Sequence, residues 1–170
     1  MTGTTTLTLG GLLAALLILI ANLHPWWTGS REMKQLAAFG KGFSAAACAA
    51  ACPGGLLGWA HSRAGTVGNG AGERVSAAAA GTTSGSTVTS GQLVGLGTTG
   101  AIIAVAVVFL VGLSYKAAGK KDKKRIIGGA FVGSTLLLTA GVAGALAWLP
   151  GALDTVGEAL KDAVQGAGIL

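Results

Sequence analysis

Charged side chains are scarce in this chain of 170 residues. Its 12 Lys and Arg and 6 Asp and Glu make up 11% of the sequence, against a hydrophobic fraction of 51%. Soluble proteins carry about 25% charged residues, so the chain has too few to cover a water-facing surface. The apolar excess also excludes the usual disordered class, which combines low hydrophobicity with high charge. The composition therefore favours a membrane protein.

Signals of catalysis are also missing. The sequence contains no HExxH, GxSxG or GxxxxGK[ST] pattern, and neither His24 nor His61 lies at a catalytic or metal-binding spacing from a carboxylate or thiol. No predicted span holds an acidic residue, which argues against a proton-coupled or ion-coupled pump. We expect a protein that is not an enzyme and that holds no cofactor and no metal.

Long uncharged runs predict the membrane spans. Residues 93–115 and 126–149 each exceed 20 residues, enough to cross a hydrocarbon core of about 30 Å. A third run, residues 7–23, has 17 residues and is just long enough. We expect an all-α integral membrane protein of three to four transmembrane helices, in which residues 93–149 form a C-terminal transmembrane hairpin.

A basic segment joins the two halves of the predicted hairpin. Residues 116–125 (KAAGKKDKKR) contain one acid and six cations, namely Lys116, Lys120, Lys121, Lys123, Lys124 and Arg125. Lys and Arg near the ends of spans stay on the cytoplasmic side, so we expect a cytoplasmic loop, with the C-terminus outside. The cations are also candidates to face anionic lipid headgroups or nucleic acid, although no aromatic residue interleaves them to stack on bases.

The path of the N-terminal half is open. Residues 1–30 form a hydrophobic segment followed by Arg31 and Lys34, which suggests an N-terminus outside the cell and a return crossing within residues 31–63. Residues 43–60 are the candidate for that crossing, with a break at Pro53. In the alternative, the N-terminus stays inside and the chain has one span fewer.

The two remaining segments differ in pattern. Residues 64–92 are Gly, Ser, Thr and Ala almost throughout and have no apolar period, which predicts a flexible linker. Residues 150–170 place Leu153, Val156, Leu160 and Val164 at spacings of three and four, which predicts a short amphipathic helix. We interpret this tail as resting on the outer membrane surface or on the bundle; a subunit contact is the alternative.

Small residues and cysteines give weaker signals. Small residues recur at spacings that suit close helix packing in lipid. Gly91 and Gly95 are four residues apart, as are Gly129 and Gly133, and Gly141 with Ala145 continues the face of Gly129 and Gly133 after a step of eight residues. Either tight packing of the hairpin or a homo-oligomer explains them. Cys48 and Cys52 are interpreted as small packing residues; a disulfide between them needs a broken helix, and lipid attachment is a remoter alternative.

The hairpin of residues 93–149, with two glycine-rich spans and a lysine-rich turn, resembles the pilin subunits of conjugative type IV secretion systems. The resemblance implies a subunit stored in the bacterial inner membrane and assembled into an extracellular filament, with the basic loop against phospholipid headgroups. It also implies a cleaved leader, for which residues 60–62 or 62–64 are candidate cleavage sites. The apolar run at residues 7–23 departs from that pattern.

These observations leave three hypotheses for function. The first is a self-assembling structural subunit or membrane component of a conjugation or secretion apparatus, partnered by phospholipid, further copies and other apparatus proteins. The second is a small pore former such as a phage holin, although the weakly acidic tail predicted outside does not fit the usual charged cytoplasmic tail. The third is an accessory membrane protein whose basic loop binds a cytoplasmic partner.

Overall fold

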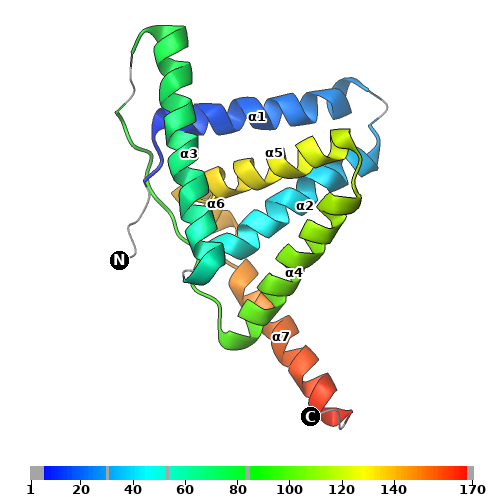
Figure 1. Ribbon diagram of the computed structural model, residues 1–170. Helices are drawn as coiled ribbons and strands as arrows, with labels where there is room; N and C mark the ends of the chain where they lie inside the picture. Colours follow the sequence, from blue (N-terminus) through cyan, green and yellow to red (C-terminus); the bar gives the residue numbers. More distant parts are fainter. Residues whose placement is uncertain (1–5, 30, 53, 83–84, 168–170) are drawn as a thin grey trace.

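The computed structural model describes residues 6–29, 31–52, 54–82 and 85–167, and the protein is helical over most of them (Figure 1). No β-strand occurs within these ranges, although isolated backbone bridges join Thr8 to Thr87 and Ser90 to Thr139. The predicted all-α class is therefore confirmed. The helices are α1 (Leu9–Thr28), α2 (Met33–Ala50), α3 (Gly55–Ala80), α4 (Thr98–Ala117), α5 (Lys120–Leu136), α6 (Ala140–Ala145) and α7 (Leu149–Gly166).

Helices α2 and α5 lie side by side with their backbones in direct contact. Gly129 of α5 faces the Phe39 carbonyl of α2, and four residues later Gly133 faces Ala46, so the two helices run in the same direction. A Cβ atom added to Gly42 would overlap the backbone of α5. Glycine permits this approach because it has no side chain, and the close backbones gain dispersion contacts.

Helix α3 extends into the segment predicted to be a flexible linker, and that prediction is wrong for residues 64–80. Gly72 faces the backbone of Gly10 in α1, and Gly68 faces Thr135 in α5. The side chain of Asn69 accepts a hydrogen bond from the Thr8 amide at 2.9 Å and donates one to the Thr6 carbonyl at 2.7 Å. The helix is stabilised by this close packing, which an apolar period does not reveal.

Residues 85–97, which we call the strap, connect α3 to α4 in an extended conformation. The amide of Val88 donates to the Leu7 carbonyl at 2.8 Å, and the amide of Gly91 donates to the Leu138 carbonyl at 2.9 Å. The amide of Ala140 donates to the Thr89 carbonyl at 3.0 Å. The strap therefore ties the start of α1 to the break between α5 and α6.

The predicted span at residues 126–149 is not one continuous helix. Helix α5 ends at Leu136, and Thr139 caps the short helix α6 by accepting a hydrogen bond from the Val142 amide at 3.4 Å. Backbone groups of Leu138 and Ala140 bond to the strap and are thus unavailable for a continuous helix. Nor do α4 and α5 pack as a hairpin, because α4 packs mainly on α7 and α2, whereas α5 packs on α2 and α1.

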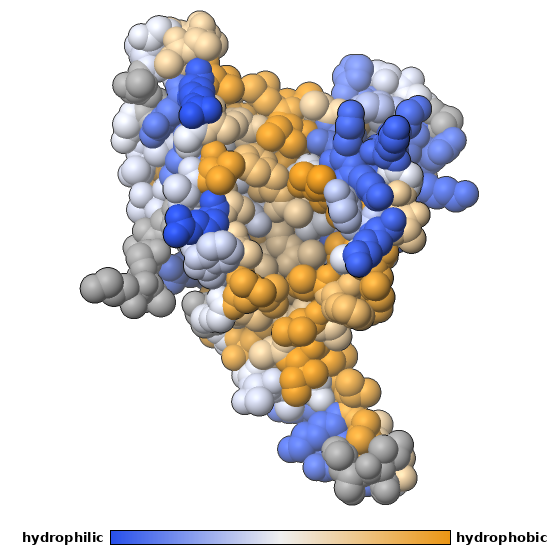
Figure 2. Space-filling model, viewed as in Figure 1, coloured by the Kyte–Doolittle hydropathy of each residue, from blue (hydrophilic) through white to orange (hydrophobic). Residues whose placement is uncertain are grey.

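Two helices in the described ranges, α1 and α4, are long and apolar enough to cross a membrane. Both turn small residues inward and large ones outward: α1 buries Ala14 and Ala15, and α4 buries Gly100 and Ala104. Their exposed residues include Leu13, Leu16, Leu17 and Ile20 in α1, and Ile102, Val105, Phe109, Leu110 and Leu113 in α4. Figure 2 shows apolar residues covering the middle of one face. Large residues outside and small ones between helices are typical of a protein surrounded by lipid.

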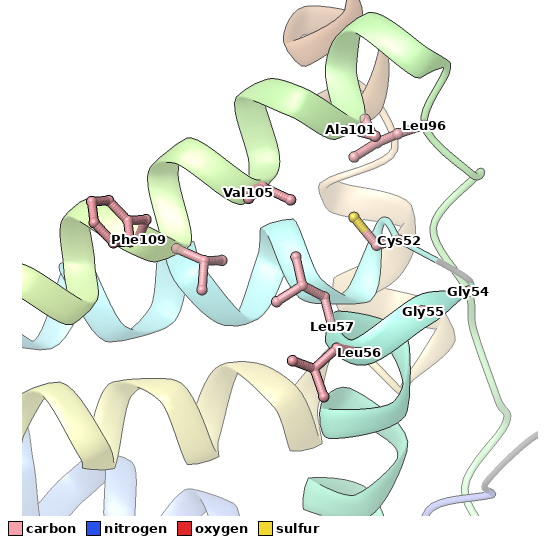
Figure 3. Close-up of a pocket in the computed structure, with 10 residues that line it drawn as sticks. Cys52, Gly54, Gly55, Leu56, Leu57, Leu96, Ala101, Val105 and Phe109 are labelled. Carbon is pink, nitrogen blue, oxygen red and sulfur yellow. The ribbon is translucent and has the colours of Figure 1, made fainter.

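A sharp corner separates α2 from α3. The two helices are bent by 113°, so the predicted crossing at residues 43–60 is not one straight helix, and only as a bent pair do α2 and α3 add a third candidate span. Gly55 has a φ of +71°, in the left-handed region that favours glycine. Pro53, where the break was predicted, lies outside the described residues. The corner and α4 border an apolar groove (Figure 3).

Helix α7 occupies most of the predicted amphipathic tail and packs on the start of α4. The carboxylate of Asp154 accepts hydrogen bonds from the amides of Gly97 at 3.2 Å and Gly100 at 3.0 Å. It thus caps α4 from another helix and places a negative charge at the positive end of its dipole. Leu153 of the predicted apolar stripe is buried, whereas Val156 and Leu160 are exposed. Residues 168–170 of the predicted tail lie outside the described ranges.

The contact between α2 and α5 predicts opposite effects for two glycines of one helix. Gly42→Ala should destabilise the protein by about 1–3 kcal/mol, because its methyl group overlaps the α5 backbone. Gly40→Ala should stabilise it by about 0.5–1 kcal/mol, because open space surrounds that position and alanine favours helix. Unfolding of the detergent-solubilised protein by heat or SDS measures both; equal effects would contradict the packing.

Candidate functional site

The predicted basic loop is mostly helical. Lys116 lies in the last turn of α4, and α5 begins at Lys120. Only Ala118 and Gly119 connect the two helices. The five cations from Lys120 to Arg125 therefore lie in the first two turns of a helix. The prediction of a loop over all of residues 116–125 is wrong because KKDKK continues directly into the buried part of α5.

The start of α2 joins these cations at the same end of the molecule. Arg125 of α5 bonds to Gln35 in the first turn of α2, which places the start of α2 beside the start of α5. Figure 2 shows hydrophilic side chains gathered in this region. We call it the basic end; it holds eight of the 12 cations, namely Arg31, Lys34, Lys116, Lys120, Lys121, Lys123, Lys124 and Arg125. From the sequence, Arg31 and Lys34 were expected only to orient the chain in the membrane.

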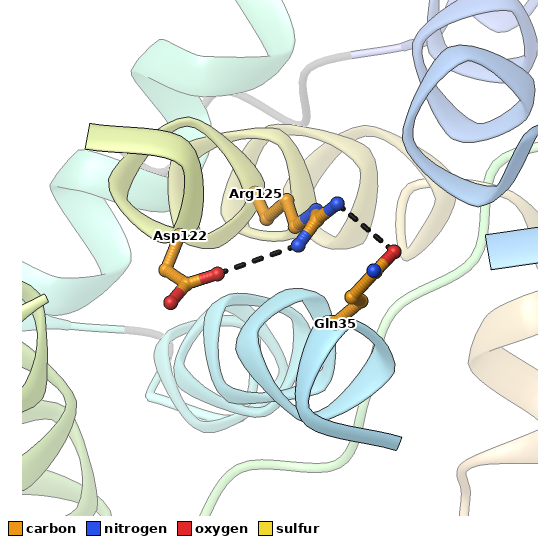
Figure 4. Close-up of polar contacts among 3 residues, drawn as sticks. All are labelled: Gln35, Asp122 and Arg125. Atoms are coloured by element: carbon orange, nitrogen blue, oxygen red, sulfur yellow. Dashed lines mark hydrogen bonds and ion pairs between the residues drawn. The ribbon is translucent and has the colours of Figure 1, made fainter. Parts of the chain in front are cut away.

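Arg125 differs from the other predicted loop cations because it bridges two helices (Figure 4). Its guanidinium donates to the Gln35 amide oxygen at 3.0 Å and pairs with the Asp122 carboxylate at 3.4 Å. The Arg125 side chain is only 17% exposed, against 49% for Asp122. Arg125 therefore holds α5 on α2 and presents little of its charge to an outside partner.

Four of the five other predicted loop cations are exposed. Lys116, Lys120, Lys121 and Lys124 are exposed, while the ammonium of Lys123 lies 5.5 Å from the centre of the Tyr115 ring in a cation–π contact. The Lys123 contact connects the start of α5 to the last turn of α4.

The charges of α5 oppose its own dipole. A helix N-terminus carries a partial positive charge, and each cation placed there costs roughly 0.3–1 kcal/mol. Asp122 is the one acid within residues 116–125, so it offsets only part of this repulsion. Anions from outside the chain would relieve the rest.

Tryptophans mark both ends of the bundle. Trp26 and Trp27 lie in the last turn of α1 at the basic end, and Trp27 is 71% exposed. Trp59 and Trp148 are exposed near the start of α3 and just before α7, at the opposite end. Trp is enriched at both membrane interfaces, and the two pairs lie at opposite ends of the bundle.

The predicted packing residues separate into two groups. Gly129 and Gly133 lie at the contact between α5 and α2, and a Cβ on Gly91 would lie 2.6 Å from Cα of Ala140. Gly95 is exposed in the strap, so Gly91 and Gly95 do not form a helix-packing pair. Gly141 and Ala145 are exposed on α6. The interpretation missed Gly10, Gly42 and Gly72, whose partners are distant in sequence.

The other candidate residues form no cluster of reactive groups. Cys48 and Cys52 are both free thiols, Cys48 being buried beside Ala104 and Leu153. His24 and His61 lie on different helices, α1 and α3. The described ranges contain no group of three or more His, Cys, Asp or Glu residues that could hold a metal ion. The candidate cleavage sites at residues 60–62 and 62–64 lie inside α3.

Comparison with known proteins finds no matching family model, no matching curated protein and no matching solved structure. Function is therefore inferred from the basic end and from the apolar surface of α1 and α4.

The bridge made by Arg125 predicts an energetic coupling between two helices. Arg125→Gln and Gln35→Ala should each destabilise the protein, and their effects should be non-additive by about 0.5–2 kcal/mol because both remove one hydrogen bond. A double-mutant cycle on thermal unfolding in detergent measures the coupling. Lys121→Gln with Gln35→Ala is the matched control, and a cycle for Arg125 as additive as that control would show that the bridge is not formed.

Proposed function

We propose that this chain is a non-enzymatic integral protein of the bacterial cytoplasmic membrane whose basic end binds the anionic headgroups of the cytoplasmic leaflet. The observation that carries the proposal is the gathering of eight cations at one end of a bundle that contains two helices suited to crossing a membrane. Lys and Arg flanking spans remain on the cytoplasmic side. The same end carries Trp26 and Trp27, residue types of the interface.

The proposed topology has both chain ends outside. Helix α1 enters from outside and delivers Arg31 to the basic end, and α2 returns. Helix α3 and the strap stay on the outer side, because the amide of Leu96 in the strap bonds to the carbonyl of Ala51 at the end of α2. Helix α4 then crosses to the basic end and α5 returns, shielded by its contacts with α2 and α1.

The energy of headgroup binding is substantial in this arrangement. Each Lys or Arg near an anionic membrane surface contributes about 1 kcal/mol of attraction. Four exposed lysines, namely Lys116, Lys120, Lys121 and Lys124, would together contribute roughly 4 kcal/mol. Lipid phosphates would also compensate the repulsion between these cations and the dipole of α5.

We further propose that the protein acts as a membrane component of a conjugation or type IV secretion apparatus, and that it keeps its N-terminal half. The first part rests on the resemblance of the sequence of residues 93–149 to conjugative pilins, although α4 and α5 do not pack as the hairpin of that family. The second rests on the contact of Gly129 and Gly133 with α2, because removal of residues 1–60 would expose that face of α5. Exposed glycine backbones in lipid lose close packing, so a processed chain would be less stable.

A lipid titration tests headgroup binding. Phosphatidylglycerol added to the detergent-solubilised protein should raise its Tm by several degrees, since 1 kcal/mol corresponds to about 2–4 °C at this size. Phosphatidylcholine should raise it less, and 0.5 M salt should weaken the effect. The variant with Lys116, Lys120, Lys121 and Lys124 changed to Gln should lose most of the response to phosphatidylglycerol.

The chain offers a matched control with the same change in net charge. Gln at Lys41, Arg63, Arg74 and Lys161 removes the four cations outside the basic end, and this variant should respond as the wild type does. Equal responses of the two variants, or equal effects of the two lipids, would show that the basic end does not bind anionic headgroups.

The mature N-terminus tests the retention of the first half. Mass spectrometry of the protein purified from membranes should find peptides of α2, such as residues 35–41, together with peptides of α5. The intact mass should include residues 33–50, because α5 depends on α2 for close packing. A mature chain that begins near residue 60 would contradict this proposal and favour a cleaved leader.

A further inference from the structure

An apolar groove opens between α4 and the corner that joins α2 to α3 (Figure 3). Its volume is about 560 Å³. Val105 and Phe109 of α4 face Leu56 and Leu57 in the first turn of α3, and Cys52 lies at the end of α2 between them. Leu96, Ala101 and Val108 also line it. None of the described lining residues carries a charge, so an occupant held by these walls must be apolar.

The position of the groove identifies the medium from which its occupant comes. One wall belongs to α4, a candidate span, and two of that wall's residues, Val105 and Phe109, are 57% and 64% exposed. The groove is therefore continuous with the apolar outer face of the bundle, which faces hydrocarbon if the proposed function is correct. Water is absent there, and lipid chains are the apolar groups at high concentration.

The length of the groove suits an extended hydrocarbon chain. The α4 wall runs from Ala101 to Phe109, which at 1.5 Å per residue is roughly 12 Å. One leaflet of the hydrocarbon core is about 15 Å deep, so an extended acyl chain matches this length.

The corner fixes the shape of the groove. Gly55 adopts a φ of +71°, and a Cβ at Gly54 or Gly55 would meet nothing within 4 Å. The corner follows the end of α2, and the groove lies along the first half of α4, so it lies toward the end of the bundle opposite the basic end. The occupant would thus come from the outer leaflet of the proposed topology.

We infer that this groove binds one acyl chain of a phospholipid of the outer leaflet. The inference rests on the proposed membrane embedding and adds a specific lipid site, remote from the basic end and selective for hydrocarbon. The bound chain fills the space between Leu57 and Val105 and supplies the contacts that these side chains lack in the protein alone.

The test uses the full chain in phosphatidylcholine nanodiscs that contain a phospholipid with a diazirine on one acyl chain. After irradiation, mass spectrometry should find adducts on Leu57, Val105 or Val108 in excess over those on Ile20, an outward residue of α1 with 59% exposure. Val105→Trp should reduce the labelling of Leu57 about tenfold, because filling the groove removes contacts of one or two methylene groups. Ile102→Trp, which changes an equally exposed residue of α4 outside the groove, should leave the labelling unchanged.

Each other outcome overturns a defined part of this account. Equal labelling of Ile20 and the groove residues, unaffected by Val105→Trp, would mean general contact with lipid and no site. Efficient coupling of Cys52 to Cys52 by a short bismaleimide, with no lipid adduct in the groove, would show that a second copy occupies it. Absence of adducts on Ile20 as well as in the groove would overturn the membrane embedding itself.

Discussion

The structure depends on the direct contact between the backbones of α2 and α5. Gly42, Gly129 and Gly133 leave no room for side chains at this contact, so each helix presents its main chain to the other. The remaining helices are arranged around the pair: α1 and α3 pack on one side, and α4 packs on α2 on the other. This arrangement leaves the large side chains of α1 and α4 on the outside, as a surrounding lipid phase requires.

Charge and hydropathy predicted the parts of the fold that follow from local sequence. The uncharged runs indicated α1 and α4, and the period of three and four indicated α7, because these patterns depend on neighbouring residues. The packing of α3 against α1 and α5 was not predicted, because Gly72 and Gly68 meet their partners only after the chain folds. Helix α5 was misjudged for a similar reason, because its end is set by hydrogen bonds to the strap.

Most residues of the candidate site were predicted from the sequence, but their arrangement in space was predicted only in part. Six cations between residues 116 and 125 were evident from the sequence. The bridge that Arg125 makes between α5 and α2 was not, because it depends on Gln35, which lies 90 residues earlier. The helical placement of these cations was also missed, because lysines seldom begin a helix and the dipole disfavours them there. The apolar groove had no sequence signal, because its walls come from α3, α4, the corner between α2 and α3, and the strap.

The separation of α2 from α5 along the chain has a consequence for biosynthesis. Gly129 follows its neighbour Phe39 by 90 residues, so at about 5–20 residues per second α5 leaves the ribosome roughly 5–20 s after α2. During that interval α1, α3 and α4 can pack beside α2, but its glycine and alanine face lacks the main chain of α5. The packing face of α2 is therefore complete only after α5 has been made, so the time between the synthesis of the two helices bears on correct assembly.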